Sequence, residues 1–353
     1  MKVKDIITIN ELEEFPSEII NLFASPFYSK NWLNYQKNYS KNIIEDLSFF
    51  MKNKEQIVGF MPLFLEKFNN IASLTFSGEY LSCLRSPVIF NCLNKKEIHS
   101  IFHKAINYID EIAIKHKVSK CSIMIDPISE CSNFIPYNLL MENDFIDIST
   151  NTLIIDLTDK EENLWRDLRK SYKSIINSSL INHKIKIYDH TNINEDIFKQ
   201  YCNIHYLASG RKTRDKKTFD IQFDMIKNNE AFLSAIFHKN EAYADSFLFF
   251  MHSNYSSVYA SGATNPDAKI KNSHSGLWKA IQYLKNKKIK KLELDTQFYS
   301  RQLFETPSQK EINISYFKKG FGGSITTLFR GVKYYDKDLL LSDLNQFINE
   351  IKN

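Results

Sequence analysis

The sequence predicts an α+β protein in which one order of helices and strands occurs twice. Its 353 residues are enough for two domains. Hydrophobic residues make up 43% of the chain and aromatic residues 14%, which suffices for packed cores and excludes a disordered chain. Apolar residues recur at helical spacing in some segments and form short or alternating runs in others, so helices and strands are both expected.

The first half predicts two helices, three strands, a long helix, a strand, a short helix and further strands. The long helix is expected at 94–116, where apolar residues recur from Ile98 to Ala113. The expected helices are 10–24, 29–38, 94–116 and 133–143, and the expected strands are 46–51, 57–66, 71–77, 120–125, 145–148 and 151–157. We expect residues 1–150 to form the first domain.

The second half repeats this order and contains the stretch 229–320, which carries the candidate site. Three apolar runs separated by polar turns predict an antiparallel meander. The expected helices are 161–181, 193–208, 217–228, 272–287, a helix ending on 316–323, and 338–351, and the expected strands are 184–188, 231–238, 242–251, 255–263, 291–295 and 324–330. We expect residues 151–335 to form the second domain and 336–353 a C-terminal helix.

The overall charge and the cysteines limit the partners and the compartment. A net charge of +5 favours anionic partners but falls short of a DNA-binding composition. The five cysteines include no Cys-x-x-Cys pair, and no metal-ligand spacing is present, so neither disulfides nor a metal are expected. The sequence shows neither a signal peptide nor a membrane-spanning run. We therefore expect a cytoplasmic protein, with peripheral contact at the inner face of the membrane as an alternative.

The segment 272–276 opens the helix that follows the meander and is a candidate anion cradle. The backbone N–H groups of Ser273, His274, Ser275 and Gly276 would lie at a helix N-terminus, where they favour phosphate groups. We therefore assign these four residues to cofactor binding. The alternative is an ordinary helix cap, which uses the same residue types.

Several motifs occur in an order typical of one enzyme family. A strand at Leu153–Leu157 is followed by the pattern Glu162-x-x-Trp165-x-x-Leu168 and by a basic helix. The chain closes on Tyr316-Phe-Lys-Lys-Gly-Phe-Gly-Gly323, and related N-terminal motifs lie at 25–32 and 57–63. With these motifs the chain resembles the FemAB-like family of double N-acetyltransferase (GNAT) fold enzymes. The resemblance implies two tandem GNAT-like domains, each a mixed, mostly antiparallel sheet flanked by helices. In that fold the fourth and fifth strands splay apart and admit the acyl group.

The resemblance implies the transfer of an acyl or aminoacyl group to an amine of a cell-envelope sugar or precursor. The donor would be an acyl-CoA, such as acetyl-CoA, or an aminoacyl-tRNA. The long helical hairpin common in the tRNA-using members is missing, which favours acyl-CoA. Two positions depart from the family pattern: Asp295-Thr-Gln297 replaces Asp-x-Gly, and 272–276 lacks the usual glycines. A non-catalytic module that binds a nucleotide sugar or carbohydrate is therefore the alternative function.

Three residues are candidates for catalysis. Lys318 in the closing motif could stabilise the oxyanion of a tetrahedral intermediate, or it could be a solvated lysine at a helix end. Asp295, at the end of the strand beside the expected gap, could accept the proton of the attacking amine, or cap a turn. Asp245 is the other candidate base, because an aspartate inside an apolar strand needs a partner or a cleft.

Four residues are candidates for binding the acceptor, which we expect to be an anionic or lipid-linked sugar. Arg211 and Arg214 lie in a loop between two helices, where arginine suits a diphosphate or a carboxylate. Lys30 and Trp32 would make similar contacts from the first domain. An ordinary surface charge is the alternative for the basic residues. Tyr299 and Tyr316 are further candidates for protonating a thiolate leaving group.

Overall fold

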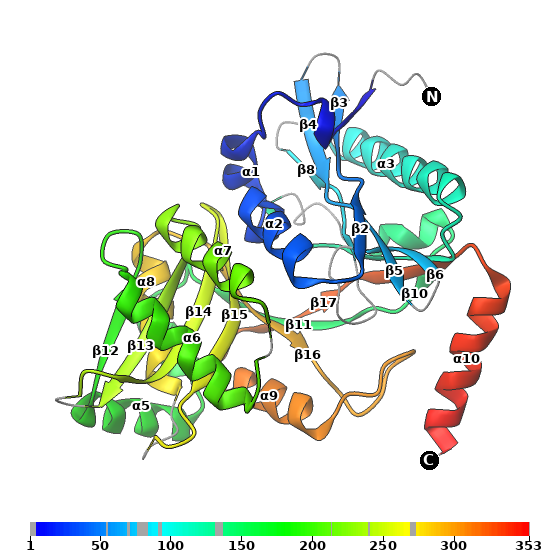
Figure 1. The fold of residues 1–353 in the computed structure, drawn as a ribbon. Coiled ribbons are helices and arrows are strands. Elements are labelled where there is room, and N and C mark those ends of the chain that lie inside the picture. Colours follow the sequence, from blue (N-terminus) through cyan, green and yellow to red (C-terminus); the bar gives the residue numbers. More distant parts are fainter. Residues whose placement is uncertain are drawn as a thin grey trace. The chain divides into compact units, whose positions relative to one another are not determined.

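The computed structural model describes residues 5–53, 56–68, 71–75, 84–90, 94–130, 137–212, 214–238, 241–268 and 273–352 (Figure 1). The chain forms two compact units. The first unit comprises Met1–Asn151, Thr296–Asn313 and Thr326–Asn353, and the second comprises Thr152–Asp295 and Ile314–Ile325. Both contain helices and mostly antiparallel sheets, which confirms the α+β class.

The first unit contains the N-terminal elements together with the last strand and helix of the chain. Its helices are α1 (Ser17–Phe23), α2 (Lys30–Tyr39), α3 (Lys95–Lys115) and α10 (Lys337–Lys352). Its strands are β1 (Ile6–Thr8), β2 (Ile43–Asp46), β3 (Phe49–Asn53), β4 (Gln56–Met61), β5 (Phe64–Phe68), β6 (Ile71–Thr75), β7 (Leu84–Arg85), β8 (Val88–Ile89), β9 (Lys120–Met124), β10 (Ile146–Asp147) and β18 (Arg330–Tyr334). They form sheets in the orders β1-β3-β4-β8 and β10-β18-β9-β6-β5-β2, with β7 beside β9.

Helix α3 shows how the sequence specifies these elements. It begins after Asn94, whose side chain accepts a hydrogen bond from the backbone of Glu97 while Glu97 bonds back, a capping box that satisfies helix-start donors. Eight apolar residues at helical spacing are buried: Ile98, Ile101, Phe102, Ala105, Ile106, Ile109, Ile112 and Ala113. The helix predicted from this spacing is therefore present, and its apolar stripe packs into the core of the unit.

The second unit is built around one sheet. Its strands are β11 (Thr150–Asp156), β12 (His183–Tyr188), β13 (Ala231–His238), β14 (Ala244–His252), β15 (Ser256–Thr264), β16 (Lys291–Gln297) and β17 (Ser324–Leu328). Its helices are α4 (Glu161–Asp167), α5 (Lys170–Asn182), α6 (Glu195–Ser209), α7 (Lys216–Lys227), α8 (His274–Asn286) and α9 (Gln309–Lys319). The strand order is β12-β13-β14-β15-β16-β11-β17. The meander β13–β15 is antiparallel, as predicted.

Helices cover both faces of this sheet (Figure 1). Leu248 and Phe250 of β14 belong to one buried cluster with Leu277 of α8 and Tyr172 of α5. The alternate residues of β14, Phe247 and Phe249, contact Tyr201 of α6 instead. Because side chains alternate along a strand, α5 and α8 lie on one face of the sheet and α6 lies on the other.

The helix predicted at 161–181 is two helices. Leu168 and Arg169 have extended backbone conformations, with ψ of 140° and 136°, which end α4 and precede α5. The backbone N–H of Arg169 donates to the carbonyl oxygen of Gly320 at 2.9 Å. The break therefore ties the start of α5 to the closing motif, a tertiary contact that the local spacing of apolar residues does not reveal.

The end of the chain also differs from the sequence-based expectation. We predicted a strand at 324–330 and a second domain that ends at 335, while the predicted C-terminal helix is present as α10 (Lys337–Lys352). The structure has two strands there, and β18 pairs antiparallel with β9 and β10 in the sheet of the first unit. Residues 326–353 and the segment 296–313 consequently group with the first unit. The start of the chain differs as well: α1 begins at Ser17, and a short 3-10 turn occupies 9–11.

Parts of three other predicted elements lie outside the described residues. These are the end of the strand at 71–77, the start of the helix at 133–143 and the first residue of the helix at 272–287. The described remainder of the helix at 133–143 is a 3-10 helix at Leu139–Asn143.

Glycines shape the turn that follows α9. Gly322 and Gly323 have φ angles of +79° and +85°, which side chains rarely adopt. A Cβ atom at Gly323 would also lie 2.6 Å from the carbonyl oxygen of Ile154. At Gly320 an added methyl group would collide with the ring of Tyr172. The backbone therefore requires glycine at these positions of the closing motif, because only glycine lets α9 end tightly against α5 and β11.

Gly323→Ala should lower the free energy of unfolding by about 2–4 kcal/mol, because it combines left-handed strain with a backbone clash. Gly210→Ala is the matched control. Gly210 also has a positive φ, +66°, but nothing lies within 4 Å of an added Cβ. The control should therefore lose only about 1 kcal/mol. Urea denaturation of both variants measures the difference, and equal losses would contradict the packing argument.

Candidate functional site

Strands β15 and β16 diverge, and this opens a gap in the sheet of the second unit. They pair in parallel at three positions, Ser256–Val258 with Lys291–Glu293, although both strands continue beyond them. The register between β14 and β15 shifts at this level: Phe250 faces Tyr259 and Phe249 faces Ser261, so Ala260 is bulged. A bulge turns a strand locally. These are the fourth and fifth strands after β11, as expected for the splayed pair.

Lys318 and Asp295 meet at this gap. Lys318 lies in the last turn of α9 and is only 6% exposed, so the alternative of a solvated helix-end lysine is wrong. Its Nζ lies 2.9 Å from Oδ2 of Asp295, whose side chain is 56% exposed. Asp295 has a φ of +75°, a strained conformation that aspartate tolerates better than most residues. The structure therefore brings two predicted catalytic residues together as an ion pair.

Tyr259 contributes a third polar group beside the gap. Its ring lies 5.9 Å from Nζ of Lys318, and its hydroxyl lies so close to Gly262 that a methyl group there would collide with it. Burial raises the pKa of the Tyr259 hydroxyl, and the charge of Asp295 adds to this shift. The hydroxyl therefore stays protonated and can act as a hydrogen-bond donor or an acid. No motif in the sequence singles out Tyr259, and the tyrosines predicted as acids from the sequence were Tyr299 and Tyr316.

The start of α8 has a different character from the one predicted. His274 is its first residue, and its imidazole packs among aromatic rings, 4.3 Å from Tyr172, 5.0 Å from Phe317 and 5.9 Å from Phe321. Burial lowers the pKa of His274 to about 4, and the charge of Arg169 contributes. The imidazole is consequently neutral at physiological pH. Its side chain packs α8 against α9, so it offers no positive charge to a phosphate group.

Ser275 and Gly276 face the protein interior. The Ser275 hydroxyl shares a 2.9 Å hydrogen bond with Ser179 of α5. The carbonyl oxygen of Gly276 accepts a bond from Ser234, and a Cβ at Gly276 would lie 2.5 Å from Leu248. The Ser275 side chain and the lack of one at Gly276 therefore serve packing. Only their backbone N–H groups, in the first turn of a helix, keep the geometry of an anion site.

Hydroxyl groups connect the cap of α8 to the sheet. The Ser273 hydroxyl lies 3.5 Å from that of Thr264, at the end of β15, and Thr264 lies 3.1 Å from the Ser246 hydroxyl of β14. The loop before Ser273, residues 269–272, lies outside the described residues. In place of the glycines common in this fold, the described start of α8 is surrounded by serine and threonine hydroxyls.

Asp245 lies at the start of β14 and pairs with a buried histidine. Its Oδ2 is 3.8 Å from Nε2 of His183, whose Nδ1 contacts the carbonyl and hydroxyl oxygens of Ser179. Burial raises the pKa of Asp245, and Glu241 adds to the shift while His183 and His238 oppose it. Because Ser179 also bonds Ser275, this polar chain reaches α8. The geometry therefore connects Asp245 to His183 and α8.

Arg211 and Arg214 have different environments. Arg211 is exposed at the end of α6, whereas the Arg214 guanidinium lies 4.5 Å from the ring centroid of Phe219. Arg214 also contacts the His205 ring, and burial lowers the pKa of that histidine to about 3. His205 is therefore neutral. Arg211 is accessible to an anionic ligand, while Arg214 is held by aromatic packing.

Lys30 and Trp32 lie in the first turn of α2, in the first unit. Ser29 caps this helix by accepting a bond from the backbone N–H of Trp32, and Lys30 is exposed. The indole of Trp32 stacks on Tyr35, with ring centroids 5.1 Å apart and planes 9° apart. The indole Nε1 is buried and has no hydrogen-bond partner among the described residues. Trp32 is thus part of an aromatic stack in its own unit.

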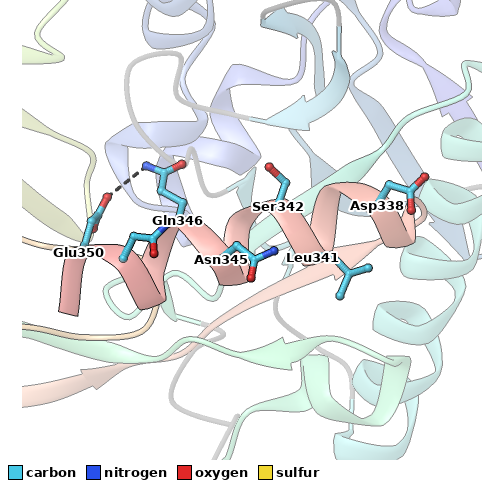
Figure 2. Close-up of a pocket in the computed structure, with 7 residues that line it drawn as sticks. Asp338, Leu341, Ser342, Asn345, Gln346 and Glu350 are labelled. Atoms are coloured by element: carbon cyan, nitrogen blue, oxygen red, sulfur yellow. Dashed lines mark hydrogen bonds between the residues drawn. The ribbon is translucent and has the colours of Figure 1, made fainter. Parts of the chain in front are cut away.

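A pocket lies along α10, away in sequence from all these residues (Figure 2). Its lining residues are Asp338, Leu341, Ser342, Asn345, Gln346, Asn349 and Glu350. Gln346 donates to Glu350 at 3.1 Å, one helical turn further on. These side chains include two carboxylates, Asp338 and Glu350, but no cation that could stabilise an oxyanion.

The described residues contain no group of three or more His, Cys, Asp or Glu side chains placed to hold a metal ion. Within the same ranges, no helix has both the length and the apolar character needed to cross a membrane.

Comparison with known proteins identifies the fold. The sequence matches no protein-family model. It also matches no curated protein. Solved structures do resemble it. A crystal structure of FemX has a TM-score of 0.65 at 10% identity, covering 92% of this chain and 98% of FemX.

Two structures of lysylphosphatidylglycerol-synthetase type are also similar. L-PGS from Bacillus licheniformis has a TM-score of 0.57 at 9% identity, covering 95% of this chain and 97% of that one. The C-terminal domain of a putative lysylphosphatidylglycerol synthetase from Agrobacterium fabrum has a TM-score of 0.56 at 11% identity, with 90% and 91% covered. At such identities the likeness concerns the fold alone. The chain has the FemAB-like double GNAT fold that its motifs predict.

Proposed function

We propose that the protein transfers an acyl or aminoacyl group from a thioester or ester donor to an amine of a cell-envelope sugar or precursor. One observation carries this proposal: the buried ammonium group of Lys318, paired with Asp295, at the gap between β15 and β16. A positive charge held out of water stabilises a developing negative charge far more than a solvated one does. This arrangement suits a reaction that passes through an oxyanion, because the Lys318 ammonium can stabilise the negative charge that develops on the oxygen.

Acyl transfer to an amine fits these groups step by step. The amine nitrogen attacks the carbonyl carbon of the donor, and the carbonyl oxygen becomes an oxyanion. The Lys318 ammonium stabilises this oxyanion, and the carbonyl re-forms as the C–S or C–O bond to the donor breaks. Positioning both substrates in the gap supplies a further part of the rate enhancement. No covalent intermediate with the protein is required.

Two protons must also move. The attacking amine loses one, and the exposed carboxylate of Asp295 accepts it beside the gap. The leaving thiolate or alkoxide gains one, and Tyr259 is suited to supply it, because burial keeps its hydroxyl protonated. Asp295 also holds the Lys318 ammonium in place. Asp245 remains a second candidate base, acting from its pair with His183.

We propose acyl-CoA as the favoured donor and aminoacyl-tRNA as the second candidate. Both carry phosphate groups, which the first-turn N–H groups from Ser273 to Gly276 can bind. The acceptor would be anionic or lipid-linked, and Lys30, Trp32, Arg211 and Arg214 are its proposed contacts. The similarity to a putative lysylphosphatidylglycerol synthetase is a fold-level analogy for aminoacyl chemistry. We place the reaction in the cytoplasm or at the inner membrane face.

A non-catalytic module that binds a nucleotide sugar is the second candidate. It is favoured by the start of α8, where Ser275 and Gly276 serve packing and His274 is neutral. A protein that had lost its donor site would keep the fold and a sugar site. It would have no need for a buried Lys318 ammonium paired with Asp295, which is why the transferase is preferred.

Lys318→Met should lower kcat by about 10²- to 10³-fold, because it removes the oxyanion-stabilising charge but keeps most of the side-chain volume. Asp295 is exposed, so it can hydrate when its partner is lost, and the melting temperature should change little. Lys310→Met, an exposed lysine on the same helix, is the control and should keep wild-type activity. Full activity of Lys318→Met in an acyl-transfer assay would refute the role of Lys318.

Asp295→Asn should lower kcat by about 10²-fold with an unchanged fold, since asparagine also tolerates the positive φ of this position. The double variant with Lys318→Met should lose less than the product of the two single losses, because the residues act as a unit. Steady-state kinetics of the four proteins give this cycle. Independent, multiplicative losses would show that the ion pair has no joint role.

Thermal-shift measurements separate the two candidate functions. A transferase that uses acyl-CoA should be stabilised by acetyl-CoA, because a ligand that binds only the folded state raises the melting temperature. An enzyme that uses tRNA should instead bind tRNA in a salt-sensitive manner. Stabilisation by nucleotide sugars alone, without response to either donor, would favour the binding module and count against transfer.

A further inference from the structure

An exposed tyrosine and a stacked arginine form a flat surface beside the start of α8. The side chain of Tyr316, on α9, is 64% exposed. The Arg169 guanidinium lies 4.1 Å from the centroid of its ring. Arg169 is fixed in this position by bonds to the Tyr316 carbonyl oxygen at 3.1 Å and to the Tyr172 hydroxyl at 3.3 Å. We call Tyr316 and Arg169 the platform.

The platform is continuous with the first turn of α8. Tyr172 contacts the Arg169 guanidinium, 4.9 Å from its ring centroid, on one side and the ring of His274 on the other. Tyr172 is itself fixed by a 3.0 Å hydrogen bond to the Phe317 carbonyl oxygen. Only the Tyr172 side chain therefore separates the platform from the start of α8. A ligand whose phosphate groups bind at the start of α8 could also reach the platform.

The surroundings of the platform are basic. Arg166, Lys170 and Lys173 lie on α4 and α5 within one or two turns of Arg169. Lys173 is held by the carbonyl oxygen of Arg166, and Asp167 offsets part of the charge through its 3.5 Å contact with Arg166. Stacked aromatic and guanidinium groups within a basic surface are the usual means of binding bases and phosphates without sequence readout.

Helix α9 relates the platform to the gap and so sets the orientation of a ligand that binds at both. Tyr316 and Lys318 are two residues apart on this helix, and one is exposed while the other is buried at the gap. A donor that is bound at both positions would place its nucleotide end outside and its reacting end beside Lys318. This arrangement suits a long donor with an adenosine phosphate at one end, which is the chemistry shared by coenzyme A and the 3′ end of tRNA.

We propose that the platform binds the adenosine phosphate part of the acyl donor. The base stacks on Tyr316 and Arg169, and the neighbouring cations contact the phosphates. This proposal rests on the proposed transferase function, because it assigns the donor of that same site. It gives Tyr316 a binding role in place of the acid role considered from the sequence.

The test measures binding separately from catalysis. The probes are adenosine 3′,5′-bisphosphate and coenzyme A for one source, and an RNA hairpin with a single-stranded CCA end for the other. The same hairpin without its terminal adenosine shows whether the base matters. The wild-type protein should bind the probes of one source, and Tyr316→Ala should raise that Kd about tenfold or more through lost stacking. Tyr316→Phe keeps the ring and should bind within twofold of wild type.

Further variants separate stacking from charge. Arg169→Gln should weaken binding and also reduce its dependence on salt, because one phosphate contact is lost. Tyr243→Ala and Lys199→Gln are the controls, since Tyr243 is 73% exposed and the Lys199 side chain 69% exposed elsewhere in the second unit. Both controls should bind the probes like wild type.

The outcomes distinguish the platform from the proposed function. Wild-type protein that binds none of the probes, or Tyr316→Ala and Arg169→Gln proteins that bind as well as wild type, would overturn the platform. An active enzyme whose donor KM is unchanged in Tyr316→Ala would do the same and leave the function standing. Binding that the variants weaken, in a protein without transfer activity, would support the platform and refute the transferase.

Discussion

The ion pair between the buried Lys318 and the exposed carboxylate of Asp295 is the interaction on which the rest of the site depends. A buried ammonium is costly unless a counter-charge lies next to it, and Asp295 supplies that charge at 2.9 Å. To do so, Asp295 adopts a φ of +75°. The glycines after α9 let that helix end against α5, which keeps Lys318 at the gap. The strained backbone of Asp295 and the three glycines after α9 thus keep the Lys318 ammonium in its place.

The start of α8 shows how a related fold can keep an anion-binding geometry without a glycine-rich loop. A helix N-terminus presents N–H groups whatever its side chains are, so the glycines chiefly allow close approach. Here the Ser275 hydroxyl bonds to Ser179 of α5, and the missing side chain of Gly276 lets α8 lie close to Leu248 of β14. Binding must then come from the backbone and from neighbouring groups. This is why the cation and ring beside α8 gain importance.

The sequence was sufficient for the elements whose signal is local, and insufficient for those that tertiary contacts decide. Helix α3 and the meander β13–β15 follow from apolar spacing alone. The break at Arg169 depends on a bond to Gly320, and β18 depends on partners in β9 and β10, so neither has a local signature. At the site, the closing motif predicted a catalytic role for Lys318, but it did not predict that the Lys318 side chain is buried. Tyr259 was missed because a bulge at Ala260, invisible in the sequence, places it beside the gap.

The path of the chain gives the site a particular dependence on both units. Asp295 is the last residue of one stretch of the second unit, and Lys318 lies in the next stretch, Ile314–Ile325. The segment that connects them, Thr296–Asn313, belongs to the first unit. The residues that join Asp295 to Lys318 along the chain therefore pack in the first unit. A second unit without Thr296–Asn313 would lose this connection, which includes the last two residues of β16, Thr296 and Gln297, and the first five residues of α9, Gln309–Asn313. Asp295 and Lys318 lie in one unit, and the covalent chain between them passes through residues of the other.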